Sequence, residues 1–150
     1  DGNVVMSCMF GKNSIDKALE KGKMLMTTAE ATAAGITSFD ITSATDKFIK
    51  ENPEILRSFL EVTAEANATY AAGKSDMKVI AKDAGMTVEK TKNQMAGFKF
   101  PSPAEQKATW FTSGGKVEGM LAFMGNMFAT SENPALSDYS KTINTSFLPD

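Results

Sequence analysis

The chain of 150 residues is predicted to adopt an α/β fold with a parallel or mixed sheet and a helix-rich carboxy-terminal part. Two observations predict this class. Short apolar runs with strand character alternate with helical segments in the first third, and the rest shows helical periodicity with cap and stop signals. Hydrophobic residues make up 42% and charged residues 23%, as in an ordinary folded domain.

Three strands are predicted, at 4–9, 24–27 and 39–44. The first is a compact apolar run, and in the third apolar and polar side chains alternate. Between them, a short helix is expected to begin at Asn13 or Ser14, and a helical turn to span 30–34.

The remaining two thirds are predicted to be helical. Asn52, Pro53 and Glu54 form a strong helix start, with a cap, a residue of fixed φ and an acid near the positive end of the helix dipole. Ser102 and Glu105 have the spacing of a capping box. The expected helices are 53–72, 75–84, 87–96, one beginning after Ser102, 116–130 and a short one within 138–148. So many helices around three strands suggest that part of the sheet lies outside this chain.

Composition excludes several classes of function. The formal net charge is −2 rather than basic, which argues against a nucleic-acid-binding protein. Histidine is absent, so the commonest general base and the usual zinc ligand are missing. No metal site or cofactor is expected. The single cysteine, Cys8, cannot form an internal disulfide and is expected to be a small buried hydrophobe.

Several sequence runs together resemble a known family. They are GKMLMTTAEATAAGITSFD, FIKENPEILRSFLEVTAEANATYAA, VIAKDAGM and the closing DYSKTINTSFL. In this order they are similar to the taurine-binding branch of the periplasmic solute-binding proteins of ABC transporters. The resemblance covers nearly the whole chain.

The resemblance implies the carboxy-terminal half of a two-lobe, type II periplasmic-binding-protein fold. Residues 1–36 would finish the second lobe, and residues 37–150 would form the carboxy-terminal part of the first. The implied function is capture of taurine or a related small sulfonate and its presentation to the transporter permease, without catalysis. The implied partners are this ligand, the permease, and either a second copy or the missing half.

Two segments are candidates for the ligand site. Phe10, Gly11 and Lys12 lie between a predicted strand and a helix start, which is where open α/β sheets bind ligands. Helix-start N–H groups and the lysine would favour an anion. A plain strand-to-helix loop is the other interpretation.

The resemblance places the second segment in the cleft, where Asp40 would pair with a ligand ammonium group. Ser38 and Thr42 supply hydroxyls that could donate to a sulfonate. A solvent-facing acid on an edge strand is an equally good interpretation of Asp40. Trp110, Phe111 and most of the ten methionines are expected to pack in the core.

Two other functions remain open. One is a pyrimidine-precursor binding protein or enzyme of the thiamine-synthesis type, which shares the implied architecture. The related synthase uses reactive histidines, and this chain has none. The other is a helical interaction module.

Overall fold

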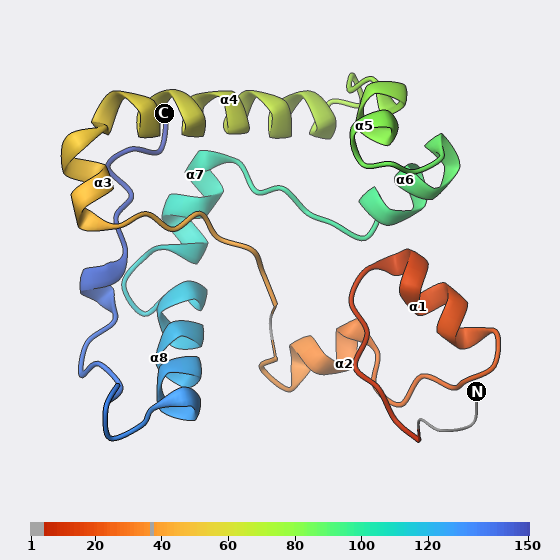
Figure 1. The fold of residues 1–150 in the computed structure, drawn as a ribbon, viewed down its shortest axis with the longest axis horizontal. Helices are drawn as coiled ribbons and strands as arrows, with labels where there is room; N and C mark the ends of the chain where they lie inside the picture. Colours follow the sequence, from red (N-terminus) through yellow and green to blue (C-terminus); the bar gives the residue numbers. More distant parts are fainter. Residues whose placement is uncertain (1–4, 37) are drawn as a thin grey trace. The chain divides into compact units, whose positions relative to one another are not determined.

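In the computed structural model, which describes residues 5–36 and 38–150, the chain divides into two compact units (Figure 1). Unit 1 consists of residues 1–34 and 74–99, and unit 2 of residues 35–73 and 100–150. Each unit is therefore made of two stretches that are distant in sequence.

The described residues of unit 1 form four helices. They are α1 (Lys12–Leu19), α2 (Thr28–Ala33), α5 (Met77–Asp83) and α6 (Val88–Met95). Helix α6 packs against both α5 and α1. Ala81 of α5 and Thr91 of α6 are buried, and the Thr91 hydroxyl donates to the Thr87 carbonyl at 2.9 Å, so this buried polar group is satisfied.

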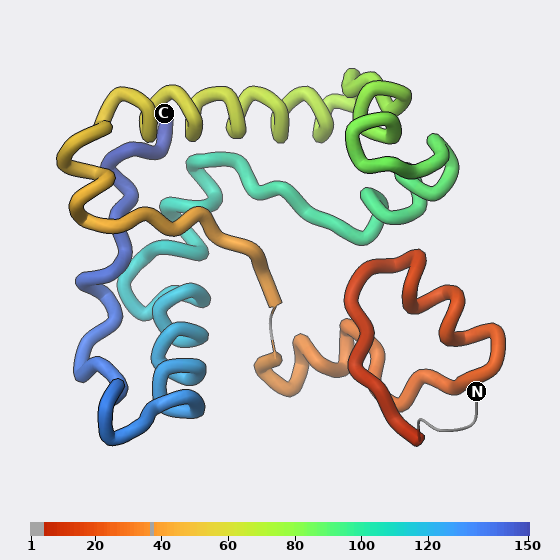
Figure 2. The backbone as a smooth tube through the Cα atoms, in the orientation of Figure 1, coloured from red at the N-terminus to blue at the C-terminus, as the bar shows by residue number. Residues whose placement is uncertain are grey.

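Unit 2 contains the longest helix. Its elements are α3 (Asp46–Glu51), α4 (Pro53–Ala71), α7 (Pro103–Glu105), a π-helical turn (Gln106–Trp110), α8 (Lys116–Phe128) and a 3₁₀ turn (Ser140–Thr142). Figure 2 shows the chain turning between α3 and α4, which pack against each other. The π-helical turn contacts both α7 and α8.

A small apolar core and a few aromatic contacts hold unit 2 together. Leu56 of α4 is 8% exposed and Val117 of α8 is 1% exposed. The rings of Tyr70 and Phe100 meet edge to face with centroids 5.3 Å apart. The Arg57 guanidinium lies 5.4 Å from the centroid of the Phe147 ring, which joins α4 to the closing segment.

The predicted α/β class is wrong, because the residues that the structure describes form no strand and no sheet. The predicted strands at 4–9, 24–27 and 39–44 are irregular, apart from Val4, which lies outside the described residues. A strand needs a neighbouring strand to pair its backbone N–H and C=O groups. None of these segments pairs with another, and Val5, Leu25 and Ile41 are exposed.

Most of the helix predictions are confirmed within two residues, namely α4, α5, α6 and α8. The capping box at Ser102 is present, although a π-helical turn follows it after three residues. Residues 138–148 form one 3₁₀ turn rather than an α-helix.

Two predicted caps are wrong. Gly11 takes the N-cap position of α1 in place of Asn13 or Ser14. Asn52 stands at the N-cap of α4 but makes no side-chain cap there, and its amide donates instead to the Phe48 carbonyl at 3.5 Å.

Large apolar side chains remain at the surface of both units. The expectation that Cys8 is buried is wrong, because it is exposed. Most methionines were expected to pack in the core, but six of them have side chains that are at least 45% exposed. They are Met6, Met9, Met24, Met26, Met124 and Met127.

The two compact units do not test the lobes that the resemblance implies. The first boundary, at residues 34 and 35, lies close to the one expected at 36 and 37. Residues 74–99, however, group with the first 34 residues rather than with α4. The assignment of lobes stays a prediction.

Candidate functional site

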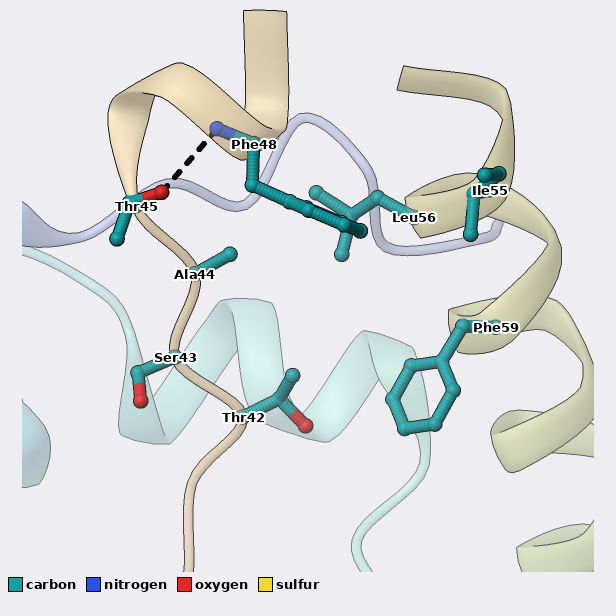
Figure 3. A pocket seen from close by; sticks show the side chains of 8 residues that line it. All are labelled: Thr42, Ser43, Ala44, Thr45, Phe48, Ile55, Leu56 and Phe59. Atoms are coloured by element: carbon teal, nitrogen blue, oxygen red, sulfur yellow. Dashed lines mark hydrogen bonds between the residues drawn. The ribbon is translucent and has the colours of Figure 1, made fainter. Parts of the chain in front are cut away.

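A hollow in unit 2 brings the second predicted segment against two helices (Figure 3). Its volume is about 420 Å³, enough for a small molecule. Residues 42–45 form one side, and side chains of α3 and α4 form the other. The hollow therefore lies where an irregular segment leads into a helix start.

Three of the residues on the first side of the hollow carry hydroxyl groups, but Figure 3 shows the Ser43 side chain pointing away from Phe48 and Phe59. The Thr45 Oγ1 atom caps α3 by accepting a hydrogen bond from the Phe48 N–H at 3.1 Å, and its own proton remains available to donate. The side chains of Thr42 and Ser43 make no hydrogen bond to any described residue. The hydroxyls of Thr42 and Thr45 are thus the candidates to donate to a ligand in the hollow.

The backbone next to the hollow is also free. Residues 38–44 lie outside the helices, and their N–H groups donate to no described residue. Unpaired N–H groups and hydroxyls are the donors that bind a sulfonate or carboxylate oxygen. This side of the hollow can accept an oxyanion without any charged residue.

The opposite side of the hollow is apolar. Figure 3 shows Phe48 of α3 and Phe59 of α4 among the side chains that line it, together with Ile55 and Leu56. Leu56 is buried in the core of unit 2, so this wall is anchored. No charged side chain is among the lining residues. The hollow therefore suits a ligand with a polar head and a small hydrocarbon part.

Ser38 and Asp40 lie just before the hollow in the chain, and both are exposed. Phe39, between them, packs edge to face on Trp110, with the ring centroids 5.6 Å apart. This contact attaches the segment to the π-helical turn. The Lys116 ammonium lies 4.9 Å from the centroid of the same Trp110 ring. Trp110 was expected to pack in the core, but it is only half-buried and contacts Phe39 and Lys116 at the surface of unit 2.

The other predicted segment lies in unit 1. Phe10 is exposed and its ring lies 6.4 Å from that of Phe98. Gly11 has φ of 83°, a left-handed conformation that favours glycine. Ser38 and Asp40 belong to unit 2, so the four predicted site residues divide between the two units.

The start of α1 is already occupied by a side chain of α6. The Gln94 Oε1 atom accepts a hydrogen bond from the Asn13 N–H at 3.1 Å. Asn93 donates to the Asn13 side-chain oxygen and to the Asp16 carboxylate, both at 2.8 Å. Lys12 is paired with Asp16 at 3.0 Å. An anion at this helix start would have to displace Gln94.

These contacts change the acidity of Asp16. The hydrogen bond from Asn93, followed by that from Lys12, holds the pKa of the Asp16 carboxyl below its usual value. Asp16 is therefore a carboxylate at neutral pH and neutralises Lys12. The positive charge that the sequence offered for an anion at this helix start is thereby reduced.

Sequence reasoning did not find Phe48, Ile55 or Phe59 as lining residues. Ile55 and Phe59 recur at helical spacing on α4, which indicates an apolar stripe without showing what covers it. The observation that identifies these residues as lining is the exposure of their side chains, which only the structure shows. The described part of the chain has no group of three or more potential metal ligands, and none of its helices is long and apolar enough to cross a membrane.

Comparison with protein-family models, with curated proteins and with solved structures finds no match to this chain.

Proposed function

We propose that this chain is a solute-binding component of an ABC importer, which captures taurine or a related small sulfonate in the periplasm and presents it to the permease. The hydroxyl-lined hollow in unit 2 is the observation on which the proposal depends. The ordered sequence resemblance supplies the class of ligand. No catalytic step is proposed.

The hollow matches the two ends of such a ligand. A sulfonate oxygen accepts hydrogen bonds from the hydroxyls of Thr42 and Thr45. The methylene groups pack on Phe48 and Phe59. Since the lining contains no acid, the ammonium group of taurine pairs with a carboxylate outside it, and Asp40 lies two residues before Thr42.

Thermal unfolding followed by circular dichroism tests this proposal. The ligands are taurine, ethanesulfonate, β-alanine, nitrate and a pyrimidine. A ligand at 100 times its dissociation constant stabilises the folded state by about 2.7 kcal/mol. Taurine or ethanesulfonate should raise the melting temperature of the full chain, and lack of a response to every sulfonate would contradict the proposal.

A pair of variants assigns the effect to the hollow. Thr42→Val keeps the size of the side chain and removes its hydroxyl, so the shift caused by sulfonates should decrease. Thr112→Val is the matched control, because Thr112 is an exposed threonine of the same unit that does not line the hollow. Equal sulfonate-induced shifts in melting temperature for the two variants would mean that the sulfonate binds outside the hollow.

The pyrimidine tests the second candidate function. The aromatic rings of Phe48 and Phe59 line the hollow and could pack against a flat heterocycle. Stabilisation by the pyrimidine, with no response to sulfonates, would favour a pyrimidine-precursor binding protein. In that case the hollow would still be the binding site, and only the assigned class of ligand would differ.

A further inference from the structure

The outer face of α4 presents an apolar stripe to solvent, and two residues of this stripe also line the hollow. Ile55, Phe59 and Val62 are spaced at i, i+4 and i+7, which places them on one side of a helix. Their side chains are 60%, 52% and 65% exposed. Leu56, on another side of α4, is the residue that enters the core. The stripe is therefore a surface feature of unit 2.

An acidic stripe runs beside it. Glu54, Glu61 and Glu65 are spaced at i, i+7 and i+11, so they also share one side of α4, next to the apolar stripe. All three are exposed, and none forms an ion pair with a described residue. A partner that covers this surface needs apolar side chains with cations beside them.

Residues 17–26 of unit 1 have that chemistry. Three lysines and one glutamate in this segment give it a net positive charge. Leu25 is 78% exposed, and three other apolar side chains of the segment are 42% exposed or more. The cations and the apolar side chains are, in order, Lys17, Leu19, Lys21, Lys23, Met24, Leu25 and Met26.

The net charges of the two units are also opposite in sign. Unit 1 has ten basic and seven acidic residues, a net charge of +3. Unit 2 has six basic and eleven acidic residues, a net charge of −5. Opposite charges on two surfaces increase their rate of encounter and favour the matched pairing over others.

We infer that the outer face of α4 is a docking surface for a second copy of this chain, which seats its residues 17–26 there. Leu25 and its apolar neighbours cover Ile55, Phe59 and Val62, and the lysines face Glu61 and Glu65. Apolar burial stabilises the pair, and the charges select this pairing. Because Ile55 and Phe59 also line the hollow, a docked copy and a ligand would compete for this surface, and the inference concerns the chain without ligand.

Sedimentation equilibrium of the full chain without ligand tests the inference. The average mass should exceed the 16.1 kDa of one chain and rise with concentration. Association should weaken between about 0.05 M and about 0.5 M salt, because salt shortens the range of charge attraction. A mass of one chain at every concentration would overturn the inference.

Charge reversal identifies the two surfaces. Glu61→Lys and Lys21→Glu should each raise the dissociation constant about tenfold, since each replaces an attraction by a repulsion. The two changes together should restore association, because the charges match again. Glu132→Lys is the control, since Glu132 is an exposed acid of unit 2 outside α4 and should have no effect beyond that of net charge.

Val62→Thr provides a second measurement that does not depend on charge. It keeps the shape of an exposed side chain, so the helix content by circular dichroism should not change, while association should weaken. Association that persists unchanged in Val62→Thr, or that is not restored in the combined charge variant, would overturn the assignment of these surfaces.

Discussion

The Gln94 side chain closes the start of α1, because its Oε1 atom accepts a hydrogen bond from the Asn13 N–H at 3.1 Å. These residues are 81 positions apart in the sequence, and their contact joins the two stretches of unit 1. The close approach depends on Gly11, since a Cβ atom there would overlap the Gln94 amide nitrogen.

Gly11→Ala is therefore expected to destabilise unit 1 by more than its backbone conformation alone requires. Gly11 combines a positive φ with ψ of 132°, a conformation that strongly disfavours alanine, and displacement of Gln94 adds to this cost. Gly85→Ala is the control, because Gly85 also has a positive φ and a Cβ atom there meets nothing within 4 Å. Urea unfolding should show the larger loss of unfolding free energy for Gly11→Ala, and equal losses would mean that Gln94 moves without cost.

Two neighbouring residues of α4 should differ sharply in their contribution to stability. Leu56→Ala removes a core side chain and should lower the free energy of unfolding by about 2–5 kcal/mol. Ile55→Ala removes a side chain that is 60% exposed, so its effect should be much smaller. Urea unfolding of both variants at high salt, where self-association is weak, measures the difference. Comparable losses would contradict the orientation of α4.

The capping boxes of α2 and α7 make two carboxyl groups more acidic. The backbone N–H of Thr27, and next its hydroxyl, lower the pKa of Glu30, and those of Ser102 do the same for Glu105. A lowered pKa in the folded state stabilises it above the unfolded-state pKa, and this contribution is lost as pH falls through the folded-state pKa.

NMR titration should therefore find the pKa of both glutamates below the ordinary value for a glutamate. In Ser102→Ala, the pKa of Glu105 should rise towards that value because one hydrogen-bond donor is removed, while the pKa of Glu30 should not change. A low pKa of Glu105 that persists in this variant would mean that the hydroxyl is not among its causes.

Asp40→Asn tests the part of the proposed function that concerns the ammonium group. A charge-assisted hydrogen bond contributes about 1.5–3 kcal/mol, so taurine should bind at least about tenfold more weakly to the variant. Ethanesulfonate has no ammonium group, and its affinity should not decrease. The shifts in melting temperature with the two ligands measure this, and an equal loss for both would exclude Asp40 as a specific ammonium partner.

The helices could be predicted from sequence because their signals are local. Pro53 sets the start of α4, and Gly73, at φ of 68°, follows its end. The α/β class could not be predicted in this way. An alternating pattern such as that of residues 39–44 indicates an extended backbone, but a sheet also requires a second strand, and nothing in the segment specifies one.

The candidate site was predictable in part. Thr42 was named as a sulfonate donor, and it lines the hollow. Phe59 shows only the helical periodicity of an apolar stripe, which does not say what covers the stripe. Gln94 gave no signal at all, because its contact with Asn13 depends on how α6 packs against α1.

The aromatic contact between Phe39 and Trp110 has a practical consequence. Trp110 is the only tryptophan, and both tyrosines, Tyr70 and Tyr139, also belong to unit 2. The intrinsic fluorescence of the protein therefore reports on unit 2 alone, whereas far-ultraviolet circular dichroism detects the helices of both units. Coincident melting curves from the two signals would mean that the units unfold together, and an earlier dichroic transition would mean that unit 1 unfolds first.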